Sequence, residues 1–164
     1  MRLLFVLLFT CALAGCKVYS FTGASIEPGT KTVRVQTIEN RADLVVPSLT
    51  QKMTLQLKNK FLNSTSLEQT TTDPDLDFSG EITQYTVTPM SAQAGETAAL
   101  NRLTITVSIS HVNKINPDKS WETSFSKFSD FDANVDISTV QERLSDDITE
   151  QLAEAIFNKA VVNW

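Results

Sequence analysis

The sequence predicts an α+β fold, a two-layer sandwich in which a four-stranded, mostly antiparallel sheet carries two helices on one face. Three observations lead to this fold class. Several stretches alternate apolar and polar residues with the period of a strand, two others repeat apolar residues with the period of a helix, and the links between them are short. The predicted order is β-α-β-β-β-α, and both amphipathic helices must then bury their apolar stripes against one face of the sheet.

The first strand and the first helix are predicted in the N-terminal half. Residues 32–38 alternate and are rich in β-branched side chains, which favours a strand. A helix is predicted from Pro47 to about Leu62, because the missing N–H of a proline would have no partner in the first helical turn anyway. Its apolar stripe repeats every fourth residue and consists of Leu49, Met53, Leu57 and Phe61. Leu55 and Leu62 fall on another side of the helix. They either contact a partner or pack under a loop, and we expect them to pack under a loop.

Three consecutive strands follow, and their short links predict an antiparallel meander. Residues 76–82 alternate before the phase slips by one residue, which predicts a bulge at residues 83–84. Pro89 is expected to end this strand, since proline cannot donate to the ladder. Residues 103–109 are the clearest half-buried strand of the chain. After a turn, the third strand is expected to begin at Trp121 and to run on toward two further phenylalanines.

The last predicted element is a helix near the C-terminus. Ser138 and Gln141 have the spacing of a capping box, which predicts the start of the helix. One face is apolar and consists of Val140, Leu144, Ile148, Leu152, Ala155 and Ile156. The opposite face is acidic and consists of Glu142, Asp146, Glu150 and Glu154. This separation predicts a helix that buries one side against the sheet.

The N-terminus has the pattern of a lipoprotein signal peptide. A basic start and a short apolar run lead to Leu13-Ala14-Gly15-Cys16, which is typical of a lipobox. We therefore expect a signal peptide at residues 1–15, a lipidated leader at 16–30 and a single α/β sandwich domain at 31–164. Acyl chains on Cys16 would anchor the protein to the membrane without crossing it.

The residues after the lipobox predict where the anchored protein lies. Lys17 rather than Asp follows Cys16, and no acidic run comes next, so we expect the outer membrane and its periplasmic face. Tyr19 and Phe21 lie close to the lipid. We expect these aromatic side chains to dock the leader onto the domain, the alternative being a position at the membrane interface.

The charge of the chain limits its partners. The formal net charge is −5, so nucleic acid is not an expected partner. Residues 17–62 carry seven Lys or Arg against three Asp or Glu, whereas residues 63–164 carry six against sixteen. This asymmetry indicates either a basic face for an anionic partner or charges that mix again on folding, and we expect mixing.

The sequence shows little that could support catalysis. There is no nucleophile elbow, phosphate-binding glycine loop or zinc-binding helix, and no cysteine is left after processing and lipidation. His111, the only histidine, is expected to be half exposed in its strand. The carboxylate pairs Asp130/Asp132 and Asp146/Asp147 are interpreted as solvated surface. We expect neither an enzyme nor a cofactor or metal.

Several segments, taken in order, resemble the LptE family of lipopolysaccharide-assembly outer-membrane lipoproteins, in the branch typical of Bacteroidota. These segments are residues 19–25, 101–107, 125–131 and 156–164, and with the lipobox and element order they cover the whole mature chain. The resemblance implies a non-enzymatic protein with two helices on a four-stranded sheet. It also implies that the protein is a plug inside the LptD β-barrel, helps this barrel assemble and binds lipopolysaccharide. No functional residue is transferred from the family.

The chemistry of lipopolysaccharide indicates which residues of this chain to consider. Its phosphates or carboxylates lie beside acyl chains, so a protein that binds it needs Arg or Lys near apolar surface. Arg34, Arg102 and Lys127 are the candidates, because they lie on or beside predicted strands. We expect Arg102 to point away from the helices and to share one end of the sheet with Lys127. For each of them, an ordinary surface cation is the alternative.

Two other functions remain open from the sequence. One is a structural lipoprotein of another cell-envelope machine, such as barrel assembly, built on the same small domain. The other is a lipid-anchored hydrolase, which the missing catalytic motifs disfavour.

Overall fold

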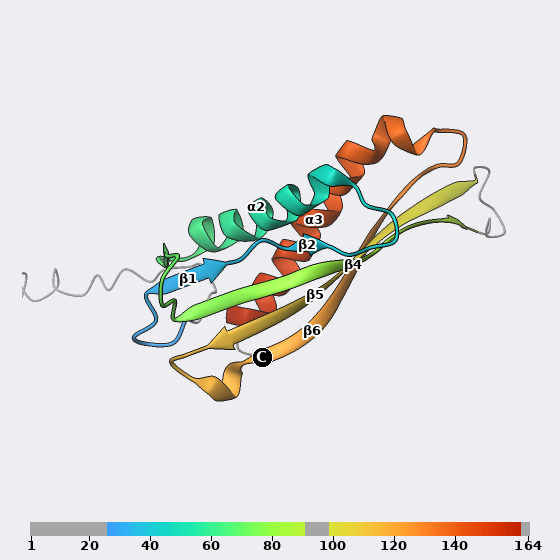
Figure 1. Ribbon diagram of the computed structural model, residues 1–164. Coiled ribbons are helices and arrows are strands. Elements are labelled where there is room, and N and C mark those ends of the chain that lie inside the picture. Colours follow the sequence, from blue (N-terminus) through green and yellow to red (C-terminus); the bar gives the residue numbers. More distant parts are fainter. Residues whose placement is uncertain (1–25, 91–98, 162–164) are drawn as a thin grey trace, which may run out of the picture.

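The computed structural model describes residues 26–90 and 99–161 (Figure 1). The predicted signal peptide, the lipidation site Cys16 and the leader aromatics Tyr19 and Phe21 lie outside the described residues. They therefore remain predictions.

The predicted fold class is confirmed, and the strand count is corrected from four to six. The elements in order are β1 Thr32–Val35, β2 Glu39–Asn40, α2 Pro47–Ser64, β3 Glu68–Gln69, β4 Leu76–Met90, β5 Leu100–Asn113, the 3-10 turn η1 Pro117–Lys119, β6 Trp121–Asp132 and α3 Ile137–Val161. The two additional strands, β2 and β3, have two residues each. Strands this short carry no alternation, so no sequence period could have indicated them.

The long strands form the predicted meander, in which β4 pairs antiparallel with β5 and β5 with β6. The sheet order is β3-β1-β4-β5-β6, with β2 also beside β4. Strand β1 lies parallel to both β3 and β4, because α2 carries the chain back before β4 begins. Both helices cover one face of the sheet (Figure 1). We call the other side the open face.

The core lies between the helices and the sheet. The predicted stripe of α2 is buried, and α3 adds Leu144, Ile148, Leu152 and Ile156. Ion pairs join the helices along their rims, between Lys52 and Asp146 and between Lys60 and Glu154. Leu55 and Leu62 are 58% and 45% exposed, so the prediction that they pack under a loop is wrong.

The ladder between β4 and β5 confirms one prediction and corrects another. Its register shifts between Ile82 and Gln84, where the bulge was predicted. Pro89 does not end the strand but pairs with Asn101, and β4 runs on to Met90. Past β2, β4 has no second strand neighbour among the described residues, and proline is tolerated on such an edge.

Gly80 marks a close approach of the two strands. A Cβ at this position would lie 2.2 Å from the carbonyl oxygen of Ser108 on β5. No real Cβ comes so close to a backbone oxygen, so the local geometry of β4 and β5 requires a residue without a side chain.

Helix α3 begins at Ile137, and its cap lies two residues before the predicted one. The backbone N–H of Ser138 donates to the carboxylate of Asp136 at 2.8 Å, and the backbone N–H of Thr139 donates to the Asp136 carbonyl at 3.0 Å. Hydrogen bonds from Ser138 lower the pKa of Asp136. The capping box of Ser138 and Gln141 was therefore wrong, because Ser138 already lies inside the first turn and Asp136 caps the helix.

Candidate ligand-binding surface on the open sheet face

The open face is lined by short hydroxyl side chains. Strands β4 to β6 direct alternate residues away from the helices, and many of these are Ser or Thr: Ser79, Thr86, Thr88, Thr104, Thr106, Ser108, Ser110, Ser124 and Ser126. The Thr106 hydroxyl lies 3.2 Å from Gln84 Oε1 and 3.0 Å from Ser126 Oγ, which links three strands. The result is a hydroxyl-rich surface with charged groups near its ends.

Arg34 lies on the open face and is held by a carboxylate of the neighbouring strand. Its Nε donates to Asp77 Oδ1 at 2.9 Å and its Nη2 to Oδ2 at 2.5 Å. Nη1 donates to the carbonyl of Thr71 at 3.3 Å. The Arg34 guanidinium holds the pKa of Asp77 below its usual range. Because these bonds use all three nitrogens and one carboxylate balances the charge, Arg34 has limited capacity for a further anion.

Arg102 also lies on the open face, in a different setting. Its Nε and Nη2 donate to the two oxygens of Asp130 at 2.7 and 2.9 Å, and its guanidinium lies 3.6 Å from the ring centroid of Phe128. The hydrogen bond from Arg102 lowers the pKa of Asp130, so this carboxylate stays charged. Phe128 is 48% exposed. A planar cation with further N–H donors is thus fixed flat on an exposed apolar ring.

Lys127 lies on the opposite side of the sheet from Arg102. It pairs with the core residue Ile105, whereas Arg102 pairs with Asp130, three positions further along β6. Since side chains alternate between faces, this odd spacing puts the two cations on different faces. The register therefore brings both cations to the predicted end of the sheet, where the start of β5 lies beside the end of β6, but on opposite faces, so they do not form one site.

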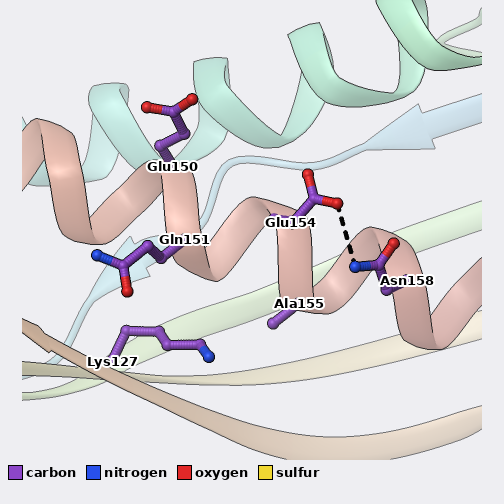
Figure 2. A pocket seen from close by; sticks show the side chains of 6 residues that line it. All are labelled: Lys127, Glu150, Gln151, Glu154, Ala155 and Asn158. Carbon is purple, nitrogen blue, oxygen red and sulfur yellow. Dashed lines mark hydrogen bonds between the residues drawn. The ribbon is translucent and has the colours of Figure 1, made fainter.

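The side chain of Lys127 lies beneath α3 (Figure 2). It lines an open groove of about 450 Å³ between β6 and this helix. The other lining residues are Glu150, Gln151, Glu154, Ala155 and Asn158. This groove is distinct from the surface around Arg102.

His111 is buried rather than half exposed as predicted. Only 2% of its surface is accessible, and its ring stacks on Phe78 with centroids 4.3 Å apart. Trp121 lies against it at 5.3 Å. Burial lowers the pKa of His111 to about 4, so the imidazole is neutral at neutral pH. The alternation of Leu103, Ile105, Val107 and Ile109 already places residue 111 on the core face, and sequence reasoning missed this.

The carboxylate pairs have structural partners. Asp130 binds Arg102, Asp146 binds Lys52 on α2, and Asp147 binds Arg143 one helical turn away. Asp132 accepts the backbone N–H of Asn134 in a turn. In residues 26–90 and 99–161, no cluster of three or more His, Cys, Asp or Glu is placed to hold a metal ion.

The register shows what sequence reasoning missed around Arg102. Phe128 was not considered as a contact of Arg102, although it has the opposite parity to Phe125 and Phe131 and must face away from the helices. Asp130 was interpreted as one member of a solvated pair. Only the antiparallel register, which sets it directly opposite Arg102, reveals the bidentate ion pair.

The sequence matches the model of one protein family. That family is LptE, described as lipopolysaccharide-assembly, and the match covers residues 30–160. The chain belongs to the LptE family. As an LptE family member it is a lipopolysaccharide-assembly lipoprotein of the cell envelope. No curated protein matches the chain.

Solved structures share the fold of this LptE family member. A minor lipoprotein from Acinetobacter baumannii is 12% identical, with 79% of this chain and 91% of that chain covered and a TM-score of 0.51. The protein XCC0632 from Xanthomonas campestris is 8% identical, with coverages of 85% and 90% and a TM-score of 0.53. A putative neuraminyllactose-binding hemagglutinin homolog from Helicobacter pylori is 13% identical, with coverages of 86% and 88% and a TM-score of 0.51. At such identities the likeness shows the fold alone.

Within residues 26–90 and 99–161, neither α2 nor α3 resembles a membrane span. Among the described residues, no helix is both long enough and apolar enough to cross a bilayer.

Proposed function

We propose that the protein is the lipoprotein partner of an LptD-type outer-membrane β-barrel, that it helps this barrel assemble, and that it binds lipopolysaccharide. The observation that carries the proposal is the family match over residues 30–160. In this proposal Cys16 carries the lipid anchor, and the domain lies on the periplasmic side of the outer membrane inside the barrel lumen. A barrel of many strands has a wide lumen, and a folded domain is needed to fill it.

The surface around Arg102 supports a contact with lipopolysaccharide. The guanidinium keeps N–H donors that its bonds to Asp130 do not use, and it lies on the exposed ring of Phe128. Met90, at the same end of β4 and on the open face, is 36% exposed. A cation beside apolar surface is the arrangement that a phosphate next to acyl chains requires.

The three candidate cations do not form one site. Arg34 aligns with Asp77 and Arg102 with Thr88, so eleven residues of β4 separate them along the open face. This separation is roughly 35 Å at the rise of a strand. Lys127 faces the helices. We therefore propose Arg102 as the principal anion contact, with Arg34 and Lys127 as separate secondary candidates.

The glycolipid contact is tested by replacing both members of the ion pair, Arg102 and Asp130, with uncharged residues. In the variant Arg102→Gln with Asp130→Asn the net charge stays the same, and we expect lipopolysaccharide affinity to fall about tenfold or more, since charge-assisted bonds to phosphate are lost. The affinity should also lose part of its dependence on salt. Binding is measured at two salt concentrations, with melting curves alongside.

The matched control is Arg143→Gln with Asp147→Asn, an exposed ion pair on α3. It should bind as the wild type does. If both variants are folded and bind lipopolysaccharide equally well, Arg102 is not a contact. Single Arg34→Gln and Lys127→Gln variants show whether either secondary candidate contributes.

The barrel partnership is tested by depletion. Cells that lack the protein should contain less correctly assembled LptD-type barrel and should admit large antibiotics. The alternative, a structural lipoprotein of another envelope machine such as barrel assembly, predicts unchanged levels of the LptD-type barrel. Immunoblots of folded barrel and antibiotic sensitivity distinguish the two functions.

The anchor is tested by Cys16→Ser. Without a thiol to acylate, the protein should remain an unlipidated precursor and should fractionate away from the outer membrane. A Ser variant that is still cleaved and still found in that membrane would contradict the lipobox.

A further inference from the structure

Strand β6 is a long sheet edge without the proline or bulge that often blocks pairing, and Lys127 is its only inward-pointing charge. All twelve of its residues pair with β5, and the register does not shift along the strand. Its other side has no strand neighbour within the described part of the chain. The strand contains neither Pro nor Gly, and a regular edge of this kind presents unpaired N–H and C=O groups to any extended segment.

The side chains beside this edge leave the core partly uncovered. Trp121 and Phe125 face the helices from β6, yet both are only partly buried. Further along β6, Lys127 and the facing residues of α3 line the groove of about 450 Å³ (Figure 2). Apolar side chains that entered between β6 and α3 would complete this flank of the core.

The described chain begins at the same end of β6. Ile26 packs against the core, and the Glu27 carboxylate accepts hydrogen bonds from Asn113 and Asn116 and binds Lys119, all at the end where β5 turns into β6. Ile26 and Glu27 also line a small cavity with Ala160 and Val161 at the end of α3. The chain therefore emerges between the start of β6 and the end of α3.

We propose that residues 17–25, which precede Ile26 and lie outside the described residues, bind along the free edge of β6 as an added antiparallel strand. A segment that ends at Ile26 and covers β6 must run opposite to β6, which starts beside Ile26. Nine extended residues span about 30 Å and the twelve residues of β6 about 40 Å, so the segment is long enough to cover about three quarters of the strand. This inference does not depend on lipopolysaccharide or on a barrel.

The sequence of residues 17–25 fits this edge. Tyr19 and Phe21 have one parity and Ser20 and Thr22 the other, so an added strand places both aromatics on one face. The proposed register sets Phe21 opposite Phe125, with the aromatics toward α3. Ser20 and Thr22 then extend the hydroxyl rows of the open face beside Ser124 and Ser126.

A second copy of the chain is a poorer occupant of the edge. Two β6 strands that pair about Ser126 would set Glu122 of one opposite Asp130 of the other, and like charges directly opposite destabilise a sheet.

The proposal is tested by disulfide formation in the mature-length chain that carries Cys16→Ser and so has no other thiol. Each of Ser20→Cys and Thr22→Cys is combined with each of Ser124→Cys and Ser126→Cys, because directly opposite residues of an antiparallel pair have Cβ atoms close enough for a disulfide. The controls combine the same two leader positions with Ser108→Cys, on the open face one strand further in.

We expect at least one edge pair to form an intramolecular disulfide under mild oxidation and the Ser108 controls to form none. Disulfides in no edge pair, or equally in the controls, would overturn the proposal. Intermolecular disulfides through β6 would overturn it too, in favour of a second copy at this edge.

Amide exchange provides a second test without new thiols. In the Cys16→Ser chain, the alternate amides of residues 121–132 that do not bond to β5 should exchange roughly tenfold more slowly than in the same chain with Tyr19→Ala and Phe21→Ala. Identical exchange in the two folded proteins would contradict the proposal, even if a disulfide had trapped a transient contact.

Discussion

A single buried imidazole makes stability depend on pH. His111 lies between Phe78 and Trp121, and burial lowers its pKa to about 4 from an ordinary value of 6.5. Asp77 on β4 raises the pKa slightly, through its backbone and its charge, but burial dominates. The folded protein thus takes up a proton on His111 less readily than the unfolded chain does.

We predict that the contribution of His111 to the free energy of unfolding is fully present above pH 6.5. It falls as the pH drops toward 4, because the unfolded chain binds the proton at a higher pH than the folded protein does. The loss attributable to His111 is about 3 kcal/mol. The variant His111→Phe, whose ring suits the same aromatic stack, should lack this component. Urea titrations of both proteins between pH 7 and pH 4 measure it, and parallel curves would show that His111 does not titrate in this range.

Single residues also show where sequence reasoning succeeds. The alternation of residues 103–109 correctly placed Arg102 on the open face, because the strand period is two and the core residues set its phase. Lys127 was grouped with Arg102 by its position along the strand, without counting the alternation of faces along residues 121–131. Counting on to Phe131, which is buried, would have assigned Lys127 to the helix side.

At the scale of elements, the contact between β4 and β5 depends on Gly80. We predict that Gly80→Ala lowers the free energy of unfolding by about 1–3 kcal/mol, because a methyl group 2.2 Å from the Ser108 carbonyl oxygen forces the strands apart. Ser79→Ala, one position earlier and directed to the open face, should change stability little. Denaturant unfolding compares the two, and equal stabilities would show that the ladder adjusts without cost.

Packing rather than charge holds the two helices together. We predict that Lys60→Ala, which removes the ion pair with Glu154, costs at most ~1 kcal/mol, because both side chains are partly exposed. Leu152→Ala removes a fully buried side chain from the same turn of α3 and should cost about 2–5 kcal/mol. Thermal unfolding ranks the two variants, and the reverse order would assign the main role to the ion pair.

Periodicity identified the long elements and failed at their ends and at the shortest ones. Helices α2 and α3 each have a stripe of several apolar residues, which a period of 3.6 makes visible. Strand β4 can continue through Pro89 because this part of β4 has a strand neighbour on the β5 side only, within the described residues. This is a property of the sheet and not of the sequence near Pro89.

At the scale of the whole molecule, the fold joins the two halves of the chain. Strand β1 pairs with β4, and α2 packs on α3, so every long element of the N-terminal half has its partner in the C-terminal half. This parallel pairing was not predictable from local patterns, which reveal strands but not their neighbours. The charge distribution of the sequence correctly predicted that basic and acidic residues mix on folding, since basic residues of α2 form ion pairs with acidic residues of α3.

We predict that a fragment of residues 26–75 is unfolded by itself. It contains β1, β2, α2 and β3 but neither β4 nor α3, so the stripe of α2 keeps only its few contacts with β1 and β2, and a helix of this length without α3 is marginal in water. Adding a second fragment of residues 76–161 should restore helical circular dichroism. Helical signal in the first fragment alone, equal to its share of the intact protein, would contradict this.

The pairing of β1 with β4 has a consequence for secretion. A chain that crosses the inner membrane from its N-terminus delivers β1 and α2 to the periplasm while β4 and α3 are still behind it. Until the C-terminal part of the chain arrives, the apolar stripe of α2 contacts only the short strands β1 and β2 and lacks α3, its main partner. If the predicted signal peptide at residues 1–15 directs export, the domain can complete its fold only after α3 has crossed the membrane.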